Sequence, residues 1–141
     1  MKRQNVMLIT FLFLVSCQMA RRGPVAATTI DLPIPRVHFM TNTSILDDEV
    51  KLSMQQNVSW FEHHPRAVVV LEGHCDEWGD DPYNMELGDR RARSVKAFLV
   101  ARGVNADRMI MIVSRGERDP LDPRHTADAW RLNRRVEFVV R

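Results

Sequence analysis

The sequence predicts an α/β domain of the α+β sandwich type, in which helices pack on a small mixed sheet of four strands. Short strand-like runs alternate along the chain with longer segments whose apolar residues recur at helical spacing, in the order β-α-β-α-β-α-β. Such alternation requires at least one crossover between parallel strands. The 141 residues leave room for one such domain and hardly for two.

Four segments have the pattern of strands. Residues 36–40 (RVHFM) alternate apolar and polar side chains, as a strand with one covered face does. Residues 67–72 (AVVVLE) form a continuous β-branched run, so we place this strand centrally, covered on both faces. Residues 109–114 (MIMIVS) and 136–140 (VEFVV) supply the other two strands.

The first helix is predicted after Ser44, which offers an N-cap with Asp47 at the third helical position. An apolar stripe at helical spacing follows and ends at Pro65; it consists of Leu46, Val50, Met54, Val58 and Phe61. Trp60 lies beside this stripe. We interpret it as a core or rim residue rather than a platform for a sugar ring.

The second helix is predicted to begin with Asp81 as the N-cap and Pro82 at the first helical position. Gly103 is expected to end it. Its apolar face comprises Leu87, Val95, Phe98 and Leu99. A polar connection and a short helix at residues 127–132 precede the last strand.

Composition excludes several classes of protein. An apolar fraction of 45% and a charged fraction of 27% are ordinary for a globular protein, which argues against a disordered or fibrous chain. The 20 basic and 18 acidic residues give a net charge of +2 without a long basic run, so we expect no nucleic-acid partner.

The N-terminus has the features of an export signal. Lys2 and Arg3 precede an apolar run at residues 6–15, which has the length of a signal-peptide core and about half the length of a membrane-spanning helix. The run ends in LVSC at residues 14–17, which resembles the lipobox of bacterial lipoproteins. This resemblance implies a signal peptide at residues 1–16 and lipid on the Cys17 thiol. An ordinary secretory signal with an incidental cysteine is the alternative.

The residues after Cys17 indicate where the lipid would be anchored. Gln18 stands where an aspartate would mark retention in the inner membrane, so the resemblance implies the outer membrane, with the domain facing the periplasm. Residues 18–35 are rich in Ala, Thr and Pro and are predicted to be an extended tether. The lipidated N-terminus and tether would span 17–35, and the folded domain 36–141. Cys75 is then left without an obvious disulfide partner.

A polar loop, residues 73–79 (GHCDEWG), follows the strand predicted to be central. Open α/β sheets commonly bind ligands at such a strand end. On the next helix Asn84, Gly88 and Arg91 occur at i, i+4 and i+7, so Asn84 and Arg91 share a face and Gly88 leaves room between them. We therefore take this loop as the candidate site.

Four short motifs resemble one known family in order and spacing: EGHCDE at 72–77, YN at 83–84, LGDRRAR at 87–93 and NRR at 133–135. They are similar to those of the OmpA-like peptidoglycan-binding domain, most of all in its subfamily of peptidoglycan-associated lipoproteins (Pal). That subfamily also shares the lipobox, Gly103-Val104 and the SRGERDP segment at 114–120. The resemblance covers about residues 37–140 and implies the fold of the OmpA C-terminal domain.

The resemblance implies a site for the free amino-acid end of diaminopimelate in the peptidoglycan stem peptide. Asp76 would hold the ammonium and Arg91 the carboxylate, and Asn84 would assist. The chemistry of a zwitterion also favours this pairing, because arginine is a planar, two-pronged donor for a carboxylate. A purely structural ion pair between Asp76 and Arg91 is the alternative.

Other positions complete the expected pocket or depart from the family. Phe39 and Asn42 match the family pattern, and Leu87 is expected to be a pocket wall. Met40 stands where the family usually carries an aspartate, and a neutral thioether cannot hold an ammonium, so we expect weaker binding there. Trp78 is expected to add an aromatic wall.

The resemblance implies a non-catalytic lipoprotein that ties the outer membrane to peptidoglycan. It would act as the Pal component of a Tol-Pal system, with TolB-like and TolA-like partners, and would support envelope integrity and constriction at cell division. The alternative is a domain that serves mainly as a docking partner in another envelope machine.

A remote alternative is a metal-dependent wall hydrolase that uses His74, Cys75 and Asp76, with His63 or His64. Adjacent residues on an extended segment point to opposite faces, and no zinc motif is present in the sequence. We therefore expect no catalytic residue, no metal and no cofactor other than the lipid on Cys17.

Overall fold

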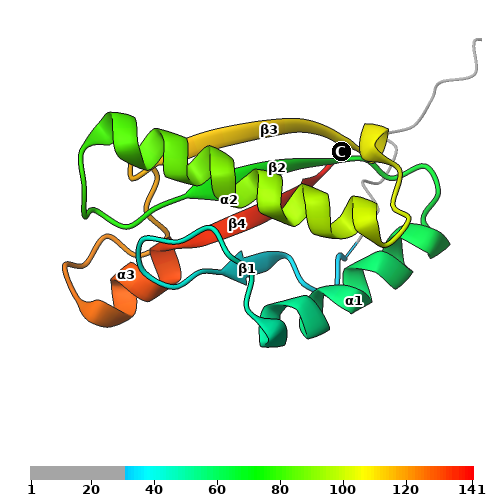
Figure 1. Ribbon diagram of the computed structural model, residues 1–141, viewed down its shortest axis with the longest axis horizontal. Coiled ribbons are helices and arrows are strands. Elements are labelled where there is room, and N and C mark those ends of the chain that lie inside the picture. Colours follow the sequence, from blue (N-terminus) through cyan, green and yellow to red (C-terminus); the bar gives the residue numbers. More distant parts are fainter. Residues whose placement is uncertain (1–30) are drawn as a thin grey trace, which may run out of the picture.

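The sheet of this protein has the strand order β1-β4-β2-β3 and carries helices as predicted (Figure 1). A computed structural model describes residues 31–141; the predicted signal peptide, Cys17 and most of the predicted tether lie outside the described residues. The elements in chain order are β1 (Arg36–His38), α1 (Asp48–His63), β2 (Val69–His74), α2 (Asp81–Ala101), the 3₁₀ helix η1 (Ala106–Arg108), β3 (Met109–Gly116), α3 (Ala127–Asn133) and β4 (Arg135–Val140).

Strand β2 lies inside the sheet, as its β-branched run predicts. It pairs in parallel with β3 and antiparallel with β4, while β1 pairs antiparallel with β4 at one edge. Helix α2 makes the crossover between the parallel strands β2 and β3, which confirms the predicted crossover (Figure 1). The carboxyl end of β2 therefore meets the first turns of α2 directly.

The core lies between the sheet and the two long helices. Apart from Val50, which is partly exposed, every residue of the predicted α1 stripe is buried, and so are all four residues of the predicted α2 face. Trp60 is buried with them, so it is a core residue. Within residues 31–141, no helix combines the length and the apolar character needed to cross a membrane.

Both predicted N-caps are displaced. The N-cap of α1 is Asp47, whose Oδ1 accepts the Val50 N–H at 2.8 Å. Ser44 is not the cap, because the preceding Thr43 forms a local turn by accepting the Ile45 N–H at 3.0 Å.

The N-cap of α2 is Asp80 rather than Asp81. Its Oδ1 accepts the Tyr83 N–H at 2.9 Å, so that Asp81 and Pro82 are the first two helical residues. Proline is tolerated there because the first turn leaves its N–H groups without helical partners.

The end of α2 confirms the predicted role of Gly103. This residue has a φ of +91° and donates to the Val100 carbonyl, while Val104 donates to the Leu99 carbonyl at 3.1 Å. The two bonds form a Schellman motif, which requires a left-handed residue.

Residues 32–35, which the sequence places at the end of the tether, contact the core and the sheet. Leu32 is buried in the core, and the buried Asn57 side chain bonds both the N–H and the carbonyl of Ile34 at 2.9 Å. The Pro35 carbonyl accepts the Phe138 N–H at 3.0 Å. Residues 32–35 therefore contact the folded unit, and the Asn57 amide satisfies the Ile34 backbone as a neighbouring strand would.

Helix α2 and strand β2 meet backbone to backbone. A Cβ added at Gly73 would lie 1.9 Å from the Gly88 carbonyl oxygen, and one added at Gly88 would lie 2.3 Å from the Ser114 Oγ. Only glycine fits at both places. This contact brings the α2 face that carries Asn84 and Arg91 against the end of β2.

The other face of the sheet carries a buried charged layer. His74 is only 1% exposed, and neither ring nitrogen has a hydrogen-bond partner among residues 31–141. Burial, together with the nearby Arg135 guanidinium, lowers the pKa of His74, which Glu137 and Asp119 partly oppose. Arg135 is held by Glu137 at 2.7 Å.

Substituting Gly73 by alanine should lower the free energy of unfolding by about 3 kcal/mol, because the new methyl group meets backbone that cannot move aside. Gly103→Ala is the matched control. It has a left-handed φ but no atom within 4 Å of the added Cβ, and should cost about 1–2 kcal/mol. Urea denaturation measures both, and equal losses would contradict the close contact.

Stability should fall as the pH drops below about 6.5, the ordinary pKa of histidine. Since the folded pKa of His74 is lowered, the unfolded chain takes up a proton on this histidine that the folded chain resists. In His74→Gln the free energy of unfolding should therefore fall less steeply between pH 7 and pH 5. The lowered pKa of His38 accounts for part of the pH dependence that this variant retains. Urea titrations at each pH measure this slope; an unchanged slope would argue against the buried neutral histidine.

Candidate functional site

A cleft of about 340 Å³ opens beyond the carboxyl end of β2, between the loop that follows it, the first turns of α2 and the β1–α1 connection. Four predicted site residues line it, and two others lie behind its surface. The lining comprises Thr41, Asn42, Asp76, Trp78, Gly79, Tyr83, Leu87 and Arg91. Phe39 and Asn84 are the buried pair behind it.

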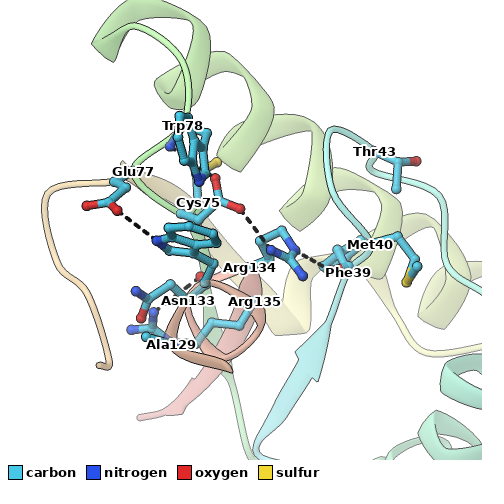
Figure 2. Close-up of polar contacts among 12 residues, drawn as sticks. Phe39, Met40, Thr43, Cys75, Glu77, Trp78, Ala129, Asn133, Arg134 and Arg135 are labelled. Atoms are coloured by element: carbon cyan, nitrogen blue, oxygen red, sulfur yellow. Dashed lines mark hydrogen bonds and ion pairs between the residues drawn. The ribbon is translucent and has the colours of Figure 1, made fainter. Parts of the chain in front are cut away.

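The Asp76 carboxylate is a fixed anion in this cleft. It is 6% exposed; its Oδ2 accepts from the Arg134 guanidinium at 2.9 Å and its Oδ1 from the Trp78 N–H at 3.2 Å. Arg134 is itself held by the Phe39 carbonyl at 3.0 Å, and its side chain lies between Cys75 and Phe39 (Figure 2). A carboxylate has about four acceptor positions, so room remains for a further donor.

Arg134 is the functional residue to which the sequence assigned no role, although it belongs to the quoted NRR motif. The predicted alternative of an ion pair between Asp76 and Arg91 is not formed, because the ion-pair partner of Asp76 is Arg134. The NRR motif could have indicated this role of Arg134. Side chains of consecutive residues in an extended segment point to opposite sides, so Arg134 and Arg135 are expected to have different partners.

The Arg91 guanidinium is fully buried and caged by acceptors. Its Nε donates to the Thr43 carbonyl at 2.9 Å, one terminal nitrogen to the His74 carbonyl at 2.8 Å, and the other to the Met40 carbonyl at 3.2 Å. It also lies over the Phe39 ring, 5.2 Å from the centroid. Burial lowers the pKa of Arg91, but arginine remains charged in proteins.

These contacts limit how Arg91 can meet a ligand. With the Cys75 sulfur at 3.4 Å as a fourth partner, one of its five N–H donors remains without a partner among residues 31–141. A two-pronged grip on a carboxylate would require one carbonyl contact to be exchanged. Arg91 thus has one N–H left for a ligand and places a buried positive charge at the lining of the cleft.

Asn84 ties the loop to its surroundings from behind the cleft. Its Nδ2 donates to Glu117 Oε2 at 2.5 Å and weakly to the Asp76 backbone carbonyl at 3.5 Å. The backbone carbonyl of Asn84 accepts from the Cys75 thiol. Its Oδ1 has no partner in the described part of the chain and lies behind Gly79. Asn84 thus positions the loop that carries Asp76.

Asn42 of the β1–α1 connection and Leu87 of α2 line the cleft from different elements. Asn42, in the β1–α1 connection, has a φ of 54°, and its Oδ1 accepts from the Tyr83 hydroxyl of α2. Asparagine tolerates this left-handed backbone better than most residues. Leu87 is buried and forms a wall, in the place that the sequence predicts.

Met40 and Trp78 differ in their relation to the cleft. The Met40 side chain is 68% exposed and does not line the cleft, so this residue contributes through its carbonyl, which holds Arg91. Trp78 lines the cleft with an indole that is 60% exposed.

Cys75 is buried, and burial raises the pKa of its thiol to about 11. The thiol donates to the Asn84 carbonyl at 3.2 Å. A protonated thiol is neither a strong nucleophile nor a metal ligand. Residues 31–141 contain no group of three or more His, Cys, Asp or Glu side chains arranged to hold a metal ion.

Known proteins are similar to this chain in sequence. The OmpA family model matches residues 38–134. The peptidoglycan-associated lipoprotein of Agrobacterium fabrum is 32% identical over 105 residues, which are 74% of this chain and 59% of that protein. The protein of the same name from Pseudomonas aeruginosa is 48% identical over 70 residues, which are 50% of this chain and 41% of that protein. The match therefore spans less than two thirds of the length of either relative.

Solved structures share the fold. The crystal structure of the peptidoglycan-associated lipoprotein from Burkholderia pseudomallei matches with a TM-score of 0.72 at 29% identity, over 77% of this chain and 91% of that one. The C-terminal domain of Helicobacter pylori MotB matches with a TM-score of 0.70 at 21% identity, over 77% of this chain and 84% of that one, which shows the fold alone. The family model matches residues 38–134, which is more than half of the chain and includes the loop after β2 and the whole of α2. The chain therefore belongs to the OmpA family.

Proposed function

We propose that this protein is an outer-membrane lipoprotein that binds peptidoglycan without catalysis and so ties the membrane to the wall. One observation carries the proposal: the nearly buried Asp76 carboxylate faces a cleft that the buried Arg91 guanidinium also lines. The relatives named peptidoglycan-associated lipoprotein support it.

The ligand is the free amino-acid end of diaminopimelate in the stem peptide. Its ammonium donates to Asp76, which has acceptor capacity beyond Arg134 and the Trp78 N–H. Its carboxylate accepts the remaining N–H of Arg91. Hydrogen bonds to charged groups are worth about 1.5–3 kcal/mol each, and the burial of Asp76 and Arg91 limits how far water screens these charges.

The anchor is the lipid on Cys17, left at the new N-terminus after removal of residues 1–16. The chain between Cys17 and residue 31 then gives the domain a reach of roughly 50 Å from the outer membrane into the periplasm. A protein held in this way acts as the Pal component of a Tol-Pal system with TolB-like and TolA-like partners. It thereby supports envelope integrity and constriction at division.

Asp76→Asn should weaken binding of the full chain, purified in detergent, to isolated peptidoglycan by about 30-fold or more, or ~2 kcal/mol, because the ammonium loses its anion. Asp89→Asn, on the exposed side of α2, makes the same change in charge and should leave binding unchanged. Co-sedimentation across a range of wall concentrations measures both. If both variants co-sedimented with peptidoglycan equally well, Asp76 would not be part of the binding site.

Free diaminopimelate should release the bound protein from the wall, whereas 1,5-diaminopentane at the same concentration should not. This diamine has the two ammonium groups of diaminopimelate but lacks the carboxylate to which Arg91 donates. The measurement is the fraction of protein in the supernatant as each compound is added. Equal release by both would show that the carboxylate is not recognised.

A further inference from the structure

A second cavity, of about 190 Å³, lies on the other side of the loop that carries Asp76. The side chains of this loop alternate between the two hollows: Asp76 and Trp78 line the cleft, whereas Cys75 and Glu77 line the second cavity. Trp130 of α3 forms one wall of the second cavity. Its volume lies below the roughly 300–1,000 Å³ of pockets for drug-sized ligands, so it suits a single ring.

A pair of indoles bridges the two hollows. Trp78 and Trp130 pack edge to face with their centroids 5.2 Å apart. The Trp130 Nε1 donates to Glu77 Oε1 at 2.7 Å, and His125 Nδ1 lies 2.5 Å from Glu77 Oε2. The Trp130 ring is therefore held in place, and the largely exposed Trp78 ring packs against it. A large aromatic face kept in one orientation without a cover is typical of a binding surface.

The polar groups of the second cavity are already paired. Asp122 forms an ion pair with Arg124 at 2.6 Å, Glu77 is held by Trp130 and His125, and Glu117 accepts from Asn84. Each of these side chains therefore has a hydrogen-bond partner, although Glu117 is bonded to a neutral amide and not to a cation. The same carboxylates and guanidinium retain free acceptor and donor positions, which suit a neutral ligand rich in hydroxyl groups.

We propose that the second cavity and the Trp78–Trp130 pair form a subsite for one pyranose ring of the glycan chain to which the stem peptide is joined. This inference rests on the proposed function. The apolar C–H face of the sugar packs on the indoles, and its hydroxyls bond to the side chains of Glu77, Asp122 and Arg124.

The two hollows lie on opposite sides of one loop segment, so a ligand that fills both must cross it. Two residues of the stem peptide join diaminopimelate to the sugar, a span of roughly 7 Å or more. Neighbouring extended backbone segments lie about 4.8 Å apart, so this span can pass over the single loop segment between the cleft and the second cavity. The protein would then bind the wall fragment both at its sugar and at its diaminopimelate.

The test compares two ligands by calorimetry on the full chain in detergent: a stem tetrapeptide with diaminopimelate, and the same peptide joined to its disaccharide. The disaccharide should raise the affinity of the unaltered protein by about tenfold. In Trp78→Ala and Trp130→Phe this gain should fall below about twofold, since stacking is lost in the first and the bond to Glu77 in the second. Trp60→Phe, which changes a core indole, is the control and should keep the gain.

The other outcomes overturn either the sugar subsite alone or the sugar subsite together with the proposed function. Equal binding of the two ligands by the unaltered protein would overturn the sugar subsite and leave the proposed function intact. A loss in Trp78→Ala that is the same for both ligands would place the indole in the peptide cleft alone and overturn the subsite. Binding of neither ligand would overturn the proposed function together with the subsite.

Discussion

The backbone contact between Gly73 of β2 and Gly88 of α2 is the constraint on which the site depends. A Cβ at either position would overlap backbone or side-chain atoms of its neighbours, so the helix approaches the strand more closely than ordinary side chains allow. Residues one turn before and after Gly88 on the same face then reach the loop beyond β2. Asn84 holds this loop from behind, and Arg91 lies against its backbone carbonyls.

The charges of the cleft are arranged so that they do not neutralise one another. Asp76 is compensated by Arg134, which lies between α3 and β4, and Arg91 by three carbonyl groups from the β1–α1 connection and the end of β2. An unpaired buried charge is costly, and each of these is stabilised without closing the space between them. The cleft can therefore offer an anion and a cation to one zwitterion, whereas a direct ion pair would have filled that space with its own contact.

The loop after β2 serves two surfaces because it is extended. Its alternating side chains give the cleft an aspartate and an indole, and give the second cavity a thiol and a glutamate. Cys75 belongs to the structural part of this arrangement, since its protonated thiol bonds to the α2 backbone. Glu77 belongs to the outer part, where it orients Trp130 and through it the exposed Trp78. The glutamate thus links the two hollows.

The sequence by itself determined the order of the elements, the central place of β2, the buried faces of α1 and α2, the family, and the loop and helix that carry the site. Periodicity reports the elements and their buried faces, because these depend on neighbours a few residues away, whereas the family was indicated by the resemblance of the motifs. Only the tertiary structure decided that Arg134 is the partner of Asp76, that carbonyls up to 51 residues away occupy Arg91, and that residues 32–35 join the core through Asn57. Side chains choose these partners among groups that meet only when the elements pack, so local pattern carries no signal for them. The N-caps lie between the two cases: the sequence placed Ser44 and Asp81 as caps near the helix starts, and the tertiary structure uses Asp47 and Asp80 instead.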